Sequence, residues 1–135
     1  MSCVKKKQDH ETQAKDMYVS TLFRGMRRYA ESHSDRWYIL SAEHGLLDPT
    51  AMIQPYNLTL KTLSVTQRQD WALRVHESLA NVLLLGDSIE ILAGVPYRKH
   101  LVPLLTSDGY KVGIPLEGLG LGQQLQALKR INESG

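Results

Sequence analysis

The chain has 135 residues, a formal net charge of +2, and a composition that is 42% hydrophobic and 22% charged. This length suits one domain, residues 1–135, which is large enough to bury a core without disulfides or a structural metal. No apolar run reaches the roughly 20 residues of a membrane-spanning helix, and the N-terminus has no signal-peptide segment, so we expect a cytoplasmic protein without a membrane partner.

The predicted elements alternate between strands and helices. Residues 1–4 look like a short strand, and Ser20 is a suitable N-cap for a helix that extends to about residue 32. Residues 36–41 have the apolar character of a buried strand. Thr66 can then cap a second helix, in which apolar residues recur at helical spacing.

The second half of the chain continues this alternation. Gly86-Asp87 ends the second helix, and residues 88–93 are predicted to form the next strand. A helix over about 98–106 and a strand over 110–116 follow. The last helix carries an apolar face made of Leu121, Leu125, Leu128 and Ile131.

Four repeats of a strand followed by a helix predict an α/β fold. Helices that connect parallel strands do so by right-handed crossovers and cover both faces of the sheet. We therefore expect a three-layer α/β/α sandwich around a small, mainly parallel sheet of about four strands.

Polar residues and glycines follow every predicted strand. The four segments are SCVKKK, SAEHGLL, AGVPY and PLEGLGLGQ, whereas the loops at the opposite ends are ordinary turns. Ligands of open parallel sheets bind beyond the carboxyl ends of the strands. The sequence therefore predicts one site at this rim, built from residues that are far apart in the chain.

Three residues are candidates for catalysis at the rim. His44 lies directly after a predicted strand and precedes Gly45. It can donate a proton or stabilise negative charge at the rim. Alternatively, its ring can form a hydrogen bond to the loop backbone. Glu43 can act as a base or remain a solvated carboxylate. Asp16, just before a predicted helix, can activate a water molecule or interact with the helix dipole.

Other rim residues are candidates for substrate binding. Lys5 and Lys7 can contact phosphate, and a lysine nucleophile is a further possibility, as is a solvated basic face. Residues 1–28 carry seven basic and three acidic residues, which favours a phosphate-bearing partner. Gly120, in GLGLGQQ, either cradles phosphate at a helix N-terminus or allows tight packing.

Two tyrosines and one serine have equally open roles. Tyr56 and Tyr97 each follow a proline in a predicted loop, where each can stack on a base or close the end of the core. Ser20 is either a helix cap or a substrate contact. The five histidines lack metal-binding spacing and the single cysteine, Cys3, cannot make a cysteine-based zinc site, so we expect no metal and no cofactor.

Six segments together resemble a family of small bacterial and phage proteins: SCVKKK, AKDMYVSTLFRGMRRYAE, WYILSAEHGLLDP, PYNLTL, LAGVPY and PLEGLGLGQQLQAL. That family is similar to the YaaA-type peroxide-stress proteins and, more distantly, to the lysine-transfer domain of archaeosine synthase. The resemblance implies a three-layer fold like that of uracil-DNA glycosylases, with the site at the strand-end rim. The residues that it assigns to the site are Lys7, Asp16, Tyr18, Ser20, Ser41, His44 and Tyr56.

The Asp-x-Tyr of KDMYVS is similar to the water-activating loop of those glycosylases, although it lacks their preceding Gly-Gln and their proline. The leading hypothesis is an N-glycosidic hydrolase that acts on a modified or unusual base in DNA, in phage defence or DNA repair. Asp16 or Glu43 would orient a water molecule, and His44 would stabilise the departing base. The alternatives are a non-catalytic DNA-binding protein of the YaaA type and a hydrolase of free nucleotides.

Overall fold

The computed structural model describes residues 7–134, and it confirms a mixed α/β protein with small sheets. The strand expected over residues 1–4 lies outside this range. The helices are α1 (Ala14–Met17), α2 (Thr21–His33), the 3-10 helix η1 (Leu60–Thr62), α3 (Val65–Ala80), α4 (Val95–Arg98), α5 (Leu101–Ser107) and α6 (Leu121–Ser134). The strands are β1 (Thr12–Gln13), β2 (Ile39–Ser41), β3 (Gly45–Leu47), β4 (Met52–Ile53), β5 (Ser88–Glu90) and β6 (Lys111–Gly113).

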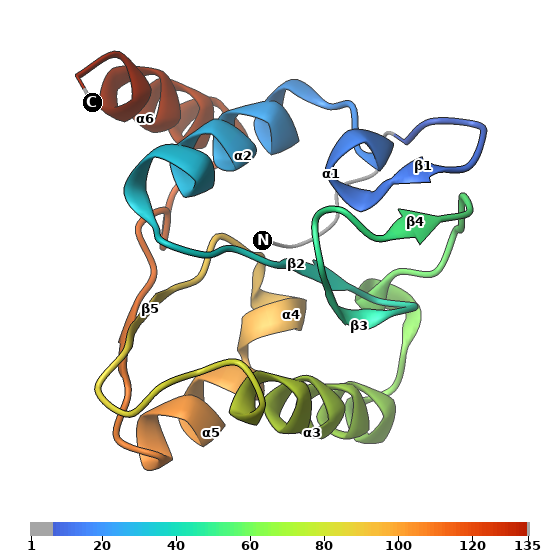
Figure 1. The fold of residues 1–135 in the computed structure, drawn as a ribbon, viewed down its shortest axis with the longest axis vertical. Helices are drawn as coiled ribbons and strands as arrows, with labels where there is room; N and C mark the ends of the chain where they lie inside the picture. Colours follow the sequence, from blue (N-terminus) through green and yellow to red (C-terminus); the bar gives the residue numbers. More distant parts are fainter. Residues whose placement is uncertain (1–6, 135) are drawn as a thin grey trace.

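Helices lie on both sides of the strands β2 and β5. In Figure 1, α2 and α6 are on one side of these strands and α3 and α5 are on the other. The helices α2 and α6 approach closely because Gly25 has no side chain, and a Cβ there would lie 3.2 Å from Leu128 Cδ1.

The strands pair differently from the sequence-based expectation. The described residues form three two-stranded sheets, β1–β4, β2–β3 and β5–β6, and only β5–β6 is parallel. The expected crossover is present there, since α4 and α5 connect β5 to β6. After β2, however, the chain turns through residues 42–44 and enters β3 at Gly45, whose φ of +72° suits glycine. The strand β3 is an antiparallel partner of β2, and Ser41 pairs with Gly45.

Two helices differ from their predicted bounds. The N-cap of α3 is Ser64, whose hydroxyl accepts the N–H of Gln67 while the Gln67 side chain accepts the N–H of Ser64. This capping box displaces Thr66, the residue that sequence reasoning chose, into the first turn. The helix expected over about 98–106 is α5, which begins at Leu101, and Pro103 stands in its first turn, where a missing N–H is tolerated. The short helix α4 precedes it, in the segment around Tyr97 that was predicted to be a loop.

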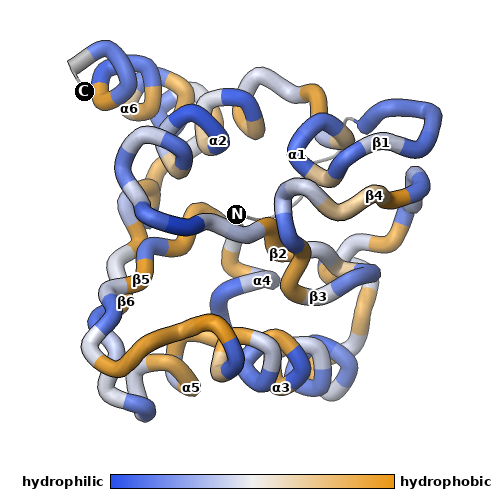
Figure 2. The backbone as a smooth tube through the Cα atoms, in the orientation of Figure 1, coloured by the Kyte–Doolittle hydropathy of each residue, from blue (hydrophilic) through white to orange (hydrophobic). Residues whose placement is uncertain are grey.

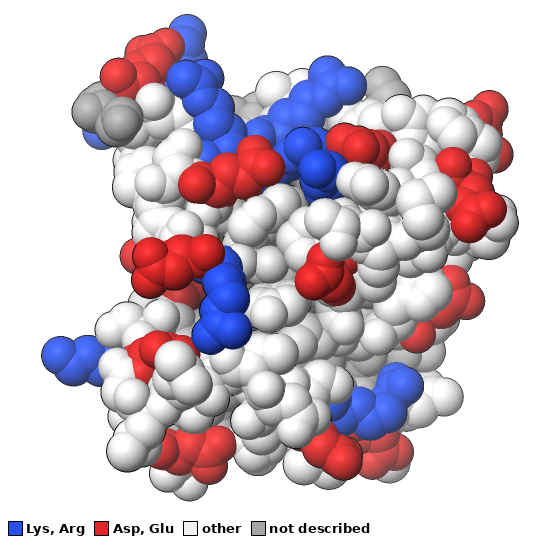
Figure 3. Space-filling model, in the orientation of Figure 1, with Lys and Arg blue, Asp and Glu red and all other residues white. Residues whose placement is uncertain are grey.

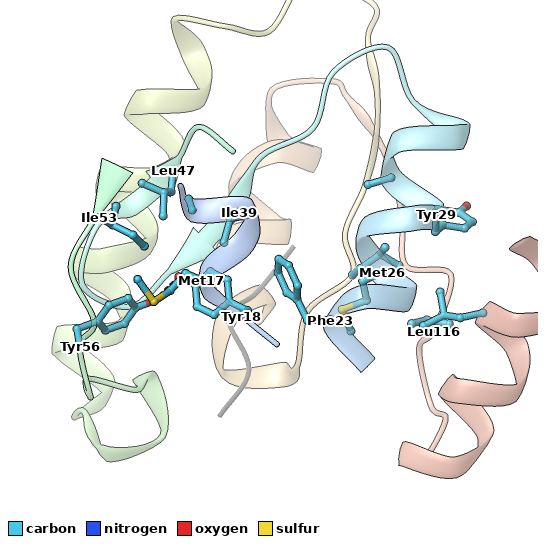
Figure 4. Close-up of a cluster of buried hydrophobic side chains, with 14 residues drawn as sticks. Met17, Tyr18, Phe23, Met26, Tyr29, Ile39, Leu47, Ile53, Tyr56 and Leu116 are labelled. Carbon is cyan, nitrogen blue, oxygen red and sulfur yellow. Dashed lines mark hydrogen bonds between the residues drawn. The ribbon is translucent and has the colours of Figure 1, made fainter. Parts of the chain in front are cut away.

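The buried side chains form two clusters, and β2 contributes to both. Ile39 belongs to the first cluster, around α1 and α2, whereas Leu40 belongs to the second, around α3 and α5. Successive residues of a strand point to opposite faces, so a strand buried on both faces contributes alternately to two cores. The predicted buried strand is therefore confirmed, and Figure 4 shows the first cluster. Within residues 7–134, no helix combines the length and the apolar character needed to cross a membrane.

Candidate functional site

Five of the predicted site residues meet where β2 ends. This β2-end cluster consists of Lys7, Tyr18, Ser41, His44 and Tyr56. Its members come from four separate stretches of chain: the segment before β1, the end of α1, the β2–β3 hairpin, and the loop after β4. The backbone brings the first two together, because Lys7 and Tyr18 form an isolated antiparallel bridge.

A chain of hydrogen bonds connects the cluster through a fully buried hydroxyl. Ser41 Oγ accepts the backbone N–H of His44 at 3.0 Å and donates to the hydroxyl of Tyr56 at 2.9 Å. The hydroxyls of Tyr56 and Tyr18 lie 2.7 Å apart. The carbonyl of Ser41 accepts the indole N–H of Trp71 at 2.9 Å. Because buried polar groups are costly without partners, this network fixes the end of β2 against α3 and the loop after β4.

Tyr56 has a charged neighbour and an aromatic neighbour. The ammonium of Lys7 lies 4.9 Å from the centre of the Tyr56 ring and 6.0 Å from that of Tyr18. The His44 ring meets the Tyr56 ring edge-on, with centres 5.5 Å apart. Tyr56 is only 7% exposed. Of its two predicted roles, this geometry matches a ring that closes the end of the core.

The solvent-facing part of the site is the turn after β2. Glu43 and His44 lie there side by side, with 3.8 Å between Glu43 Oε2 and His44 Nε2. Their side chains are 48% and 35% exposed, respectively. A carboxylate and an imidazole at this distance form a loose ion pair when the imidazole is protonated, and both groups remain accessible to a ligand.

Asp16 and Ser20 have structural partners. Arg27 Nη1 donates to Asp16 Oδ1 at 2.9 Å and to the carbonyl of Lys15 at 3.0 Å, which ties α1 to α2. The Ser20 hydroxyl accepts the N–H of Phe23 at 3.1 Å and caps α2, as predicted.

The remaining predicted residues lie elsewhere. Tyr97 is buried in the second core, edge-on to Trp71 with ring centres 5.6 Å apart. The N–H of Gly120 donates to Gln123 Oε1 at 3.0 Å at the start of α6, so this N–H is already used in capping the helix. Lys5 lies outside the described residues.

Sequence reasoning missed Trp71 and Arg27. Trp71 is placed on the apolar face of α3 by its helical spacing, but its indole N–H must also find a buried acceptor, and that acceptor is the last carbonyl of β2. The spacing gave no way to identify this partner 30 residues away. Arg27 belongs to a basic helix face, and its link to Asp16 depends on how α1 turns into α2.

Two clefts lie away from the β2-end cluster. A cleft of about 270 Å³ is bordered by Lys15, Trp37 and Asp48, and a larger one of about 460 Å³ lies between α2, the end of α3, β5 and α5. They share residues 36–38. Within residues 7–134, no three His, Cys, Asp or Glu side chains are grouped to hold a metal ion, and the absence of a cofactor stays a prediction.

Comparisons with known proteins identify relatives but no activity. The model of a family of unknown function, DUF6884, matches residues 1–130. The chain is also similar to the uncharacterized protein YfjM of Bacillus subtilis (strain 168), with 30% identity over 124 residues that cover 89% of this chain and 80% of YfjM. No solved structure matches. Because the family model spans nearly the whole sequence, the chain belongs to the DUF6884 family.

Proposed function

We propose that the protein is a cytoplasmic N-glycosidic hydrolase that removes a modified or unusual base from DNA. The observation that carries this proposal is the convergence of Lys7, Tyr18, Ser41, His44 and Tyr56 at one end of β2. A cation, an imidazole and an adjacent carboxylate are the groups that a glycosylase uses to hold phosphate, to stabilise the departing base and to orient water.

In this proposal, the exposed turn after β2 performs the chemistry. His44 stabilises the negative charge that develops on the departing base as the bond to C1′ breaks. Glu43, 3.8 Å from the imidazole, orients the attacking water molecule. Asp16 is the less favoured of the two carboxylates because Arg27 already holds it at 2.9 Å.

The buried part of the cluster supports the turn. Ser41 holds the backbone N–H of His44, and Tyr56 braces the imidazole from the side. Lys7 lies over the Tyr56 ring, where its ammonium can contact a phosphate beside the flipped nucleotide. A preorganised support of this kind limits the movement of catalytic groups during the reaction.

A hydrolase of free nucleotides is the second candidate, and the charge distribution favours it. Figure 3 shows basic and acidic side chains of the described residues intermixed on the face in view, rather than in a continuous basic band. A protein that binds duplex DNA contacts several phosphates with its basic side chains, whereas binding of a mononucleotide requires only one or two such contacts. A rate on a mononucleotide that is insensitive to salt supports this candidate, and a rate that falls steeply with salt supports DNA.

We also propose that the fold is a three-layer α/β/α sandwich of the uracil-DNA glycosylase type. The resemblance of the six sequence segments further leads us to propose relationships to YaaA-type proteins and to the lysine-transfer domain of archaeosine synthase. Helices on both sides of β2 and β5 support this fold (Figure 1). The test is a comparison of an experimentally determined structure with those of uracil-DNA glycosylases. Helices that superpose on both sides of β2 and β5 are the expected outcome, and a different arrangement of these elements contradicts the proposed relationship.

The test of the function is a screen for released bases. The purified protein is incubated with uracil-containing DNA and with hypermodified phage DNA, and free bases are identified by mass spectrometry while DNA binding is measured in parallel. Release of one base from at least one DNA is expected. Binding without release of any base contradicts the hydrolase and identifies a DNA-binding protein without catalysis.

A further inference from the structure

The larger cleft is separate from the β2-end cluster. Its volume is about 460 Å³, within the range of small-molecule sites, and its walls are α2, residues 34–38, the end of α3, β5 and α5. Tyr29 borders this cleft, and Figure 4 shows Tyr29 at the opposite end of the first core from Tyr56. The two places can therefore bind different molecules.

The floor of the cleft is apolar. Leu40, Leu79 and Leu105 are buried beneath it, and Leu83 lines its edge. The apolar surface continues past Leu83 to Leu84 and Leu85, which are 66% and 99% exposed. This stretch is the hydrophobic connection between α3 and β5 in Figure 2. Adjacent exposed leucines beside a cleft are typical of a surface that binds an apolar group.

The rim of the cleft has an excess of negative charge. Asp35, Asp87 and Glu90 line it, against the single guanidinium of Arg36. Arg36 extends across one side, where its Nη2 donates to the carbonyl of Val82 at 2.8 Å. A cleft with three carboxylates and one fixed cation attracts a positively charged group.

Aromatic rings lie beside Glu90. Tyr29 donates its hydroxyl to Glu90 Oε2 at 2.6 Å, and the His33 ring stacks on the Tyr29 ring with centres 4.6 Å apart. Burial, together with the neighbouring Glu90, raises the pKa of Tyr29 to about 12, so Tyr29 stays a donor at neutral pH. Trp37 and Tyr38 line the same cleft and add two further rings, which favour a cationic nitrogen.

We infer that this cleft binds a small amphipathic cation, a molecule with an apolar body of moderate size and one positively charged nitrogen. The apolar body lies over the leucine floor, and the charged nitrogen lies at the rim between Glu90, Asp35 and the aromatic rings. The inference is independent of the proposed glycosidic activity, because none of the residues of the β2-end cluster lines the cleft.

Trp37 provides a readout of binding, and variants at Asp35 and Glu90 assign the signal to this cleft, because Trp37 also borders the smaller one whereas Asp35 and Glu90 do not. The chain has two tryptophans, and Trp71 is buried in the second core, whereas the half-buried Trp37 lines the cleft. Decyltrimethylammonium is titrated below its micelle-forming concentration, and Trp37 fluorescence is followed. Decanoate and decanol serve as probes with a similar tail and a negative or neutral head. Saturable binding of the cation, at least about tenfold tighter than of decanoate, is expected.

Two sets of variants test where the cation binds. The double variant Glu90→Gln, Asp35→Asn removes two charges while preserving shape, and it is expected to weaken binding by about tenfold. Glu117→Gln, at an exposed carboxylate outside the cleft, is the matched control and leaves binding unchanged. In Trp37→Phe, calorimetry detects binding without the Trp37 fluorescence, so it checks that the fluorescence signal comes from Trp37. Circular dichroism checks that the probe does not unfold the chain.

Three results overturn the inference. The first is the absence of saturable binding of decyltrimethylammonium to the folded wild-type chain. The second is equal affinity for decanoate, which shows that the rim does not select charge. The third is unchanged affinity in the double variant, which shows that the cation binds elsewhere.

Discussion

Ser41 is the residue on which the β2-end cluster depends. It is the fully buried polar residue among the described ones, and its hydroxyl serves both the N–H of His44 and the hydroxyl of Tyr56. Removing the hydroxyl leaves a donor without its partner and loosens the turn that carries Glu43 and His44.

We therefore expect Ser41→Ala to lower the free energy of unfolding by about 1–3 kcal/mol, since an orphaned buried polar group is expensive. Urea denaturation measures the change. Ser107→Ala, at an exposed position at the end of α5, is the control and stays within about 0.5 kcal/mol of wild type. A Ser41→Ala variant as stable as this control would show that the hydrogen-bond chain does not hold the turn.

Tyr29 gives a second prediction at this scale, through the dependence of stability on pH. Its pKa is about 12 in the folded chain, above the ordinary value of 10.0, because of burial and the bond to Glu90. The unfolded chain loses the proton first as pH rises, so this contribution to stability is complete below pH 10 and is lost between pH 10 and 12.

The expected measurement is the urea midpoint across that pH range. The midpoint of Tyr29→Phe falls less steeply between pH 10 and 12 than that of wild type. Tyr110→Phe, in a tyrosine packed against the second core, retains the wild-type slope. Equal slopes for wild type and Tyr29→Phe contradict the link between Tyr29 and Glu90.

At the scale of the elements, the first prediction concerns which residue caps the start of α3. Ser64 forms a capping box with Gln67, whereas Thr66 lies two residues further, inside the first turn. Ser64→Ala is expected to lower the free energy of unfolding by about 1 kcal/mol, because it leaves a helix N–H without an acceptor. Thr66→Ala is the matched variant and changes little. Thermal denaturation that ranks the two in reverse order refutes the assignment of the cap.

The elements also show what the sequence could and could not predict. The helices α2, α3 and α6 and the strands β2, β5 and β6 were found because their apolar spacing and caps are local signals. The short strands β1, β3 and β4 were missed, since two or three residues carry too little periodicity. Gly45 was placed directly after His44, but its position at the start of an antiparallel strand depends on packing against α3.

At the scale of the whole molecule, the sequence predicted part of the candidate site. Lys7, Tyr18, Ser41, His44 and Tyr56 lie together at the end of β2, where the Lys7–Tyr18 bridge and the chain of hydroxyl groups bring them into contact. Asp16 and Tyr97 have other partners, which depend on how the helices pack and which spacing does not encode. Gly120 bonds Gln123, three residues away, in the cap of α6. The larger cleft, formed between elements distant in sequence, left no signal in the sequence.

The central claim is that the turn carrying His44 removes a base from DNA, and the most direct measurement compares base release by wild type, His44→Gln and His10→Gln. His10 is an exposed histidine paired with its neighbour Asp9, so His10→Gln is the matched control. We expect His44→Gln to release the base about 100-fold more slowly than wild type while binding the same DNA, because the departing base loses its stabilising group. His10→Gln should retain the wild-type rate. Equal rates for all three proteins, or no release by wild type from any DNA tested, contradict the claim.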